Sequence, residues 1–342
     1  MPATSVGLRK LQVANFAIET APGTLVPATK TWLGKVSYTP VLDIQNPGYP
    51  QGIPGAVVVE DTFANEAGML INLEDFELSV EQMAYIQNLG INKALTSAGT
   101  TPFLLDNFAF PTSATVNDIA TWTGQFDDGI QKFECGYLFC EKFSEHGERG
   151  QNGGVLMANA QLRGRKRATG WTGTPAPTVI PNIQRLNINN LTVKIDALGT
   201  AAGSGAAVSN WVIGYNLDVE TGWQADPTAS GRASLDFAQA LYNGEHKVTG
   251  SLICVMNAQS VTQIANARSA QAIILQLQIA GTGTRKLTRN LPIYWTKDPE
   301  WGKADRNGFH EVTLEFEAGY SRTATAQGIS MPINLSASTT LS

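Results

Sequence analysis

The chain has 342 residues, a formal net charge of −5 and only 15% charged residues, against roughly 25% in typical soluble domains. Its length predicts two domains, and its acidic balance argues against a protein that holds nucleic acid by releasing counterions. We find no signal-peptide pattern and no window near the ~18 apolar residues of a membrane span. We therefore expect neither export by that route nor insertion into a membrane.

The first half of the chain predicts an arm followed by a β-rich module. Residues 1–32 form the predicted N-terminal arm, with one short strand at 11–18 and a turn at Pro22-Gly23. Alternating apolar residues and strand formers then predict several strands and one helix. The predicted strands are 34–42, 56–62, 69–78, 121–126, 131–143 and 155–165, and the predicted helix is 79–89.

The second half predicts a similar set of elements after a linker rich in Gly, Pro and Thr. The predicted strands are 186–195, 211–220, 247–256, 272–280, 285–296 and 309–318, with a helix at 260–269. From residue 321 the chain is rich in Ser, Thr and Ala without periodicity, which predicts an arm that is ordered only when a neighbour holds it. Deleting this arm should leave a folded protein that polymerises poorly. The predicted organisation is an N-terminal arm at 1–32, module 1 at 33–168, a linker at 169–180, module 2 at 181–320 and a C-terminal arm at 321–342.

Two short stretches suggest that the halves are duplicates. SVEQMA at 79–84 and SVTQIA at 260–265 each follow a predicted strand, and each has a Ser three residues before a Gln, which is the spacing of a helix capping box. The loops at 44–55 and 197–210 occupy the same place in the predicted order. We therefore predict a mainly β fold made of two tandem β-sandwich or barrel modules, each closed by one packed α-helix.

Residues that commonly carry chemistry are scattered. The histidines have no Cys or carboxylate at ligand spacing, and the cysteines are predicted to be reduced, buried thiols. The Gly281–Lys286 stretch lacks the spacing of a phosphate-binding loop, and Ser204 lacks the strand-to-helix elbow of a nucleophile. We expect no catalytic residue, no metal site and no cofactor.

Several segments together resemble the tail tube, or major tail, proteins of long non-contractile-tailed bacteriophages. The opening LQVANFAIETAPGTLVPATKTWL resembles that family through its short strand and the turn containing Glu19, Thr20, Gly23 and Thr24. FECGYLFCEKFSEHGERGQNGGVLMANAQLRGRKR resembles the family's hairpin that ends in a Gly-Arg-Lys stretch. LNINNLTVKID and HKVTGSLI resemble its second-domain strands.

The resemblance implies a structural virion protein that self-assembles into stacked rings and conducts genomic DNA during ejection. Because single-module members form hexameric rings, a chain with two modules implies a trimeric, pseudo-hexameric ring. The implied partners are other copies of the chain, a tape-measure protein, a tail terminator and the baseplate or distal tail proteins. Double-stranded DNA would pass through the lumen without specific binding. The implied location is the tail of a virion, assembled in the cytoplasm of a host bacterium.

Candidate site residues follow from this expectation. A lumen that passes DNA should carry acidic rather than basic side chains, because lysines and arginines would bind phosphates. The candidate lumen residues are Glu60, Asp61, Glu66, Glu74, Asp75 and Glu77. Pro47, Tyr49, Pro50 and Ile53 are candidates for a loop that contacts the next ring, and Arg163, Arg165 and Arg167 for salt bridges between modules.

Two other functional classes remain open at this point. The chain has seven tryptophans, among them Trp211, Trp223, Trp295 and Trp301, which could serve a carbohydrate-binding β-sandwich of a virion or an adhesion module. An enzyme on a β scaffold is the other alternative, although no acid and base stand at a usable spacing. Burial of the tryptophans would disfavour the first of these classes.

Overall fold

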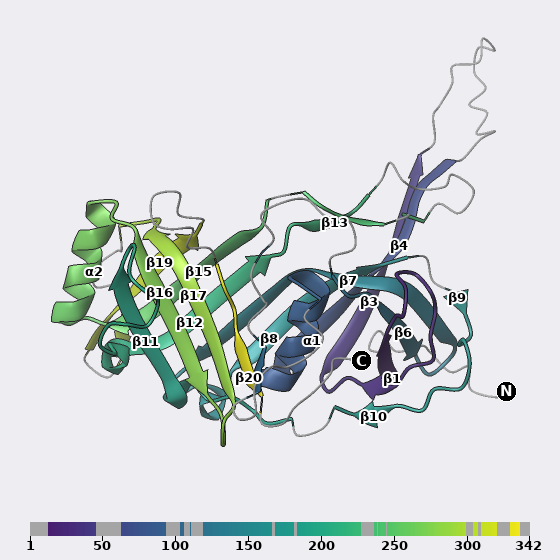
Figure 1. Ribbon diagram of the computed structural model, residues 1–342, viewed down its shortest axis with the longest axis horizontal. Coiled ribbons are helices and arrows are strands. Elements are labelled where there is room, and N and C mark those ends of the chain that lie inside the picture. Colours follow the sequence, from purple (N-terminus) through teal and green to yellow (C-terminus); the bar gives the residue numbers. More distant parts are fainter. Residues whose placement is uncertain are drawn as a thin grey trace, which may run out of the picture.

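A computed structural model shows a mainly β chain with two α-helices among the described residues (Figure 1). The structure describes residues 13–45, 63–93, 103–105, 110, 119–165, 168–180, 183–226, 236–237, 239–243, 245–298, 304–306, 309–319 and 329–335. The two predicted modules lie side by side along the long axis of the molecule.

Module 1 is built from six main strands and one helix. Its strands are β1 (Val13–Ile18), β3 (Lys35–Gln45), β4 (Phe63–Glu77), β6 (Trp122–Asp127), β7 (Lys132–Glu148) and β8 (Met157–Gly164), and its helix is α1 (Val80–Gly90). Antiparallel pairing places the strands in the order β3-β4-β8-β7-β6-β1. Buried residues of α1 and of all six strands belong to one hydrophobic core cluster.

Module 2 repeats this arrangement. Its strands are β11 (Leu191–Ala197), β12 (Val212–Glu220), β15 (Lys247–Val255), β16 (Ile273–Ala280), β17 (Lys286–Trp295) and β19 (Phe309–Ala318), and its helix is α2 (Ala258–Arg268). They pair in the order β12-β15-β19-β17-β16-β11. Each strand of module 1 thus has a counterpart of the same rank in module 2, and the predicted duplication is confirmed at the level of strand order.

The observed strand order gives the first two strands of module 2, β11 and β12, counterparts in module 1 that differ from those predicted from the sequence. β1 is the counterpart of β11, whereas the sequence pattern matched β11 to β3. The loop at 197–210 therefore corresponds to residues 19–34, and the β3–β4 loop corresponds to the β12–β15 connection. The sequence pattern went wrong because it placed β1 in an arm outside the module. The predicted strand at 56–62 lies outside the described residues.

The two helices begin with different caps. The side chain of Ser79 accepts a hydrogen bond from the backbone N–H of Gln82, as predicted. In α2 the cap is Asn257, and Ser260 is the third residue of the helix and completes a capping box with it. The prediction that Ser260 begins the helix was therefore wrong, because a Ser also serves as the third residue of such a box.

One pairing joins the modules into a single sheet. Residues 142–148 of β7 pair antiparallel with 214–220 of β12, which gives the continuous order β3-β4-β8-β7-β12-β15-β19. One hydrophobic cluster also contains buried residues from both modules, such as Leu73 of β4 and Leu275 of β16. We call this seven-stranded array the merged sheet.

The predicted N-terminal arm is largely part of module 1. All six residues of β1 pair with β6, and Phe16 and Trp32 are buried beside Trp122. The Glu19 carboxylate accepts hydrogen bonds from the Thr121 hydroxyl at 2.7 Å and the Tyr137 N–H at 2.8 Å, which fixes the turn that follows β1. Residues 13–32 are therefore part of module 1, and the boundary predicted at residue 32 was wrong.

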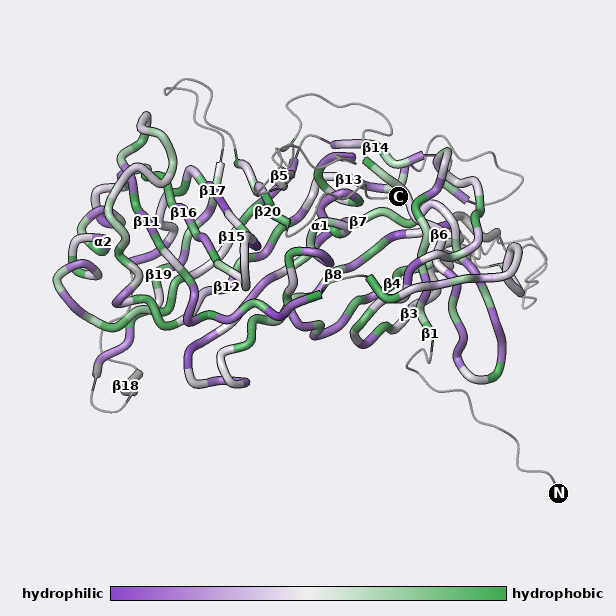
Figure 2. The backbone as a smooth tube through the Cα atoms, turned by 60° about the horizontal axis from the view of Figure 1, so that its bottom comes forward, coloured by the Kyte–Doolittle hydropathy of each residue, from purple (hydrophilic) through white to green (hydrophobic). Residues whose placement is uncertain are grey.

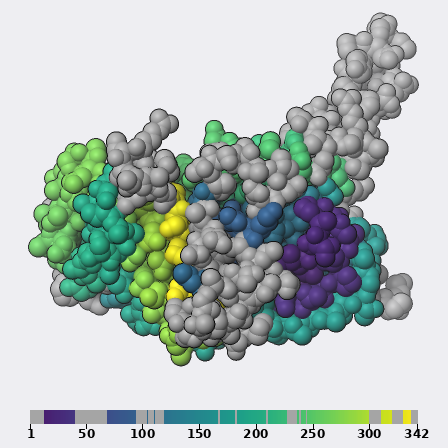
Figure 3. Space-filling model, in the orientation of Figure 1, coloured from purple at the N-terminus to yellow at the C-terminus, as the bar shows by residue number. Residues whose placement is uncertain are grey.

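The described part of the C-terminal arm is held by its own chain. β20 (Ile333–Leu335) pairs with β17 on one side and with β5 (Phe103–Leu105) on the other. Met331 and Ile333 are fully buried. Figure 3 shows this segment, in yellow, between module 2 and the blue α1. Residues 329–335 need no neighbouring chain for their order, which corrects the expectation from sequence.

The predicted linker lies along module 1. Thr172 donates through its N–H to the buried Glu134 carboxylate at 2.6 Å, and the Trp171 indole N–H donates to two backbone carbonyls. The remaining short elements are β2 (Lys30–Thr31), β9 (Ala168–Thr169), β10 (Thr178–Val179), β13 (Trp223–Ala225), β14 (Ala240–Tyr242), β18 (Ala304–Arg306) and 3-10 turns at Asn152–Gly154, Ile188–Asn190 and Ser209–Trp211. The linker is thus fixed to module 1 by hydrogen bonds.

Candidate functional site: the polar face of the merged sheet

The merged sheet has one apolar and one polar face. In β19 the residues alternate strictly between buried positions, such as Val312 and Leu314, and exposed or half-buried ones, such as Thr313 and Glu315. Figure 2 shows hydrophilic and hydrophobic residues interleaved along these strands. Because successive side chains point to opposite faces of a sheet, this period of two gives one face to the core and the other to solvent.

Strand pairing aligns the polar residues in rows across both modules. One row is Ser37, Asn72, Gln161, Lys142, Glu220 and Lys247. The next row is Asn159, Ser144, Asp218, Thr249 and Glu317, and a third is Met157, His146, Asn216, Ser251 and Glu315. The three rows hold four carboxylates and two lysines, so this face is rich in uncharged polar groups with an acidic excess.

The polar face is hollowed at its centre. A cavity of about 580 Å³ opens there and is lined by residues of β4, β7, β8, β12 and β15, Ser144 and Asp218 among them. Near the middle of β7 the β13–β14 hairpin of module 2 covers Phe139, packing Trp223 and Phe237 around it. This hairpin forms one rim of the polar face and joins module 2 to module 1 a second time.

Three of the candidate lumen residues are described with their side chains. Glu74 lies on the polar face and accepts a hydrogen bond from the Ser37 hydroxyl. Asp75 sits at a bulge with a φ of 41° and is exposed, and Glu77 is paired with Arg185 at 2.7 Å. Of the other candidates, Glu66 opposes Asp43 in the β3–β4 ladder, and Glu60 and Asp61 lie outside the described residues.

The β3–β4 ladder extends beyond the rest of the sheet. Pairing continues to Gln45 and Phe63, whereas β8 stops pairing with β4 at Met69. The result is a two-stranded ribbon that projects from module 1 (Figure 1). The candidate loop residues Pro47, Tyr49, Pro50 and Ile53 lie outside the described residues.

The basic run at the end of β8 contacts the second half of the chain through Arg165. The Arg165 Nε donates to the Phe237 carbonyl at 3.0 Å, and its guanidinium stacks on the Tyr137 and Phe237 rings. Arg163 is buried on β8 opposite Phe139, and burial lowers its pKa. Arg167 lies outside the described residues. The predicted salt bridges of these three arginines stay a prediction.

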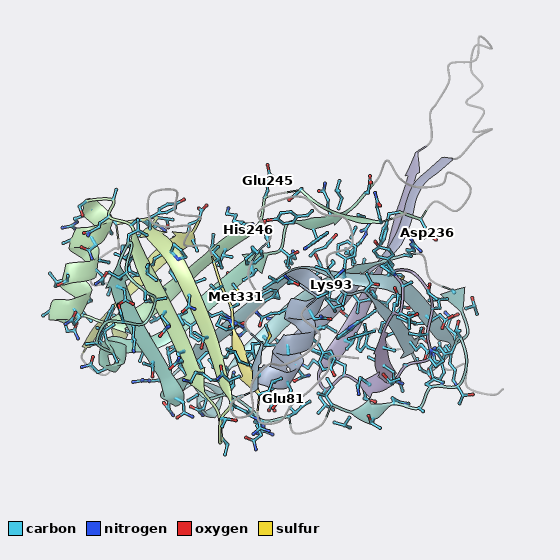
Figure 4. All side chains as sticks on the ribbon, viewed as in Figure 1. Glu81, Lys93, Asp236, Glu245, His246 and Met331 are labelled. Carbon is cyan, nitrogen blue, oxygen red and sulfur yellow. The ribbon has the colours of Figure 1, made fainter. Side chains whose placement is uncertain are left out.

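Two buried ion pairs between the modules were not predicted. Arg285 Nε lies 2.6 Å from Glu81 Oε1, and Arg289 of β17 pairs with Glu145 of β7, both side chains being fully buried. Burial raises the pKa of Glu81, although the hydrogen bond from Arg285 opposes that rise. Figure 4 places Glu81 at one end of α1, and Met331 lies between α1 and the strands of module 2. The partners are far apart in sequence, so no local pattern could have identified them.

The second pair belongs to a larger buried network. The Tyr215 hydroxyl donates to Glu145 at 3.4 Å, and Arg289 Nη1 donates to the Thr288 carbonyl at 3.1 Å. Gln87 of α1 lies 3.5 Å from Arg289 and donates to the Met331 carbonyl at 3.0 Å. The network therefore connects both modules, α1 and the C-terminal segment at one point.

The three cysteines and the described candidate tryptophans are buried. All three cysteines are free and buried, as predicted, and burial raises the pKa of the Cys135 and Cys140 thiols above their ordinary value. Within the described residues, no group of three or more His, Cys, Asp or Glu side chains is placed to hold a metal ion. Trp211, Trp223 and Trp295 are buried, so they offer no sugar-stacking surface.

No protein-family model and no curated protein sequence matches the chain. The described part of the chain contains no helix with the length and apolar character needed to cross a membrane.

Proposed function

We propose that this protein is the subunit of a bacteriophage tail tube, in which three copies form a ring of six modules around a DNA-conducting lumen. The observation that carries the proposal is the junction between the modules. Two copies of one strand order are joined where the C-terminal half of β7 pairs with β12, the edge strand of module 2. The chain thus contains one example of the contact that a ring of such modules would repeat.

The merged sheet leaves a strand edge open at each end. Among the described residues, β3 pairs only with β4, and β3 is the counterpart of β12. At the other end, Tyr294 and Trp295 of β17 pair with β19 but lie beyond the pairing of β17 with β16. These two residues and the short β18 have no strand on their outer side in the described part of the chain. Open edges pair readily with other strands, and closing a ring removes them. Pairing of β3 with the β17–β18 edge of the next copy would repeat the β7–β12 junction.

The polar face suits a surface along which DNA moves. Its rows of Asn, Gln, Ser and Thr side chains offer hydrogen bonds without a basic patch, and the carboxylates outnumber the lysines. Lumenal cations would bind phosphates and slow the passage, because phosphate contacts dominate the affinity of proteins for DNA. We assign this face to the lumen and the projecting ribbon to contacts between rings.

The biological setting of the proposal comes from the resemblance. The tube would be part of the virion tail and would be assembled in the cytoplasm of the host bacterium. A tape-measure protein would fill the lumen during assembly, and terminator and baseplate or distal tail proteins would contact the two ends. The carbohydrate-binding alternative gains no support from the described tryptophans, which are mostly buried.

Electron microscopy of the purified protein tests this function. Negative staining should show rings or hollow filaments with six lobes around a central hole. Native mass spectrometry of a single ring should give three times the 36.6 kDa mass of the chain. A monodisperse monomer under all assembly conditions, or a closed particle without a hole, would refute the proposal.

A further inference from the structure

The two helices have corresponding places in their modules but differ in burial. All eleven residues of α1 are buried, and the helix lies between the two modules (Figure 1). In α2 only Ser260, Gln263 and Ile264 are buried, and Val261 is 46% exposed. α2 therefore presents to solvent a surface whose counterpart on α1 is covered.

Module 2 supplies much of the cover over α1. The Gln87 amide donates to the Met331 carbonyl at 3.0 Å, just before β20, and Glu81 pairs with Arg285 at the tip of the β16–β17 hairpin. β20 itself pairs with β17 on the side away from β16. The covering surface is therefore the hairpin tip together with the short strand beside it.

Module 1 carries its own version of this covering surface. β9 pairs with β7 on the side away from β6, as β20 does with β17. In module 1, Thr169 of β9 opposes Phe133 of β7. In module 2, the counterpart of Phe133 is Arg289 of β17, and Met331 lies level with Arg289. Thr169 is therefore the counterpart of Met331. Thr169 is exposed, and so is Ile130 in the β6–β7 turn. Within the described part of the chain, this surface covers no helix.

The uncovered helix and the unused covering surface lie at opposite ends of the molecule. In Figure 1, α2 is at one end of the long axis and β9 is at the other. They cannot meet within one chain, but a head-to-tail contact between copies brings them together. Such heterologous contacts close into a ring when the rotation between successive copies closes.

We propose that α2 of one copy packs against β9 and the β6–β7 turn of the next copy, in the way that α1 packs against the end of module 2. The inference rests on the proposed ring and specifies its outer contact. Ala265 is the eighth residue of α2, as Gln87 is of α1, and it is exposed. Within one chain, Gln87 of α1 contacts Met331. The counterpart of Gln87 is Ala265 and the counterpart of Met331 is Thr169, so Ala265 faces Thr169 of the next copy.

Cysteine crosslinking of the assembled full-length protein tests this contact. The double variant Ala265→Cys, Thr169→Cys is treated with a short bismaleimide, to which the three buried native cysteines should stay unreactive. Covalent dimers and trimers are expected on denaturing gels, and none are expected for either single variant. The matched control is Ala265→Cys with Val179→Cys, because Val179 is 54% exposed on β10 of the same module but outside the proposed contact.

The possible outcomes separate this inference from the proposed function. Rings seen by microscopy without crosslinks in the test pair would overturn the α2 contact and leave the tube proposal standing. Equal crosslinking of the control pair would also overturn the contact. Absence of rings for the unmodified chain would overturn both. Independently, Ala265→Arg should abolish ring formation while the circular dichroism spectrum stays that of the unmodified chain, and normal rings from this variant would count against the contact.

Discussion

Replacing Arg289 by Met tests the buried network that connects the modules. The change leaves the Glu145 carboxylate fully buried, with the Tyr215 hydroxyl at 3.4 Å as its remaining side-chain donor. Removing one partner of a buried ion pair typically costs about 3–5 kcal/mol, because the other charge stays desolvated. We therefore expect Arg289→Met to lower the free energy of unfolding by ~4 kcal/mol, a large share of the usual 5–15 kcal/mol.

Removing both charges should restore much of this loss. The double variant Glu145→Met, Arg289→Met leaves neither charge of this pair, and apolar replacements of buried ion pairs are often neutral or stabilising. We expect the double variant to be more stable than Arg289→Met, with a coupling energy of roughly 2–3 kcal/mol between the two sites. Urea unfolding at pH 7.5, followed by tryptophan fluorescence on unassembled protein, measures all members of the cycle.

The exposed pair of Arg268 with Asp298 supplies the matched control. Its atoms lie 3.1 Å apart, but the two side chains are 53% and 58% exposed. Water screens such a pair, so Arg268→Met should change the free energy of unfolding by less than about 1 kcal/mol. If Arg289→Met is as mild as this control, or if the two substitutions of the buried pair are additive, the reasoning about burial is wrong.

Three further predictions concern the C-terminal segment, a histidine and a helix cap. Deleting residues 329–342 should lower the free energy of unfolding in urea by about 3–6 kcal/mol, because the burial of the Met331 and Ile333 side chains is lost. An unchanged unfolding midpoint would contradict this. Burial lowers the pKa of His246, so stability should fall as the pH drops below ~6.5, and His246→Gln should flatten that dependence between pH 7.5 and 5.5. Asn257→Ala should lower the free energy of unfolding by ~1 kcal/mol, because it removes the N-cap of α2. An unchanged stability would contradict Asn257 as the N-cap and favour Ser260.

The period-two pattern made most long strands predictable. The predicted strand 309–318 coincides with β19, and 247–256 differs from β15 by one residue. These strands have one buried and one exposed face, so every second residue reports its environment in the sequence. The duplication was visible for the same reason, since both halves repeat the same sequence of alternating segments.

Contacts between distant residues left no such pattern. The pairing of Arg289 with Glu145 spans 144 positions, and neither residue differs locally from a solvated charge in a strand. Residues 329–335 lie in an arm rich in Ser, Thr and Ala, yet every second residue of this segment is apolar and buried. Three of them form a strand because β17 and β5 offer edges on both sides. The polar face, and hence the candidate site, could be assembled only once the register of seven strands was known.

The two modules differ at corresponding connections, and this difference bears on how rings would stack. The β3–β4 ladder continues outward to Gln45, whereas the β12–β15 ladder stops at Glu220, where the chain folds down into β13 and β14 over module 1. Both features lie along the same edge of the molecule in Figure 1. A ring of three copies would therefore alternate a projecting ribbon with a folded hairpin around one rim. Because only every second module carries a ribbon, a following ring would fit in three equivalent orientations rather than six. The difference between the two modules would thus set the rotational register between rings.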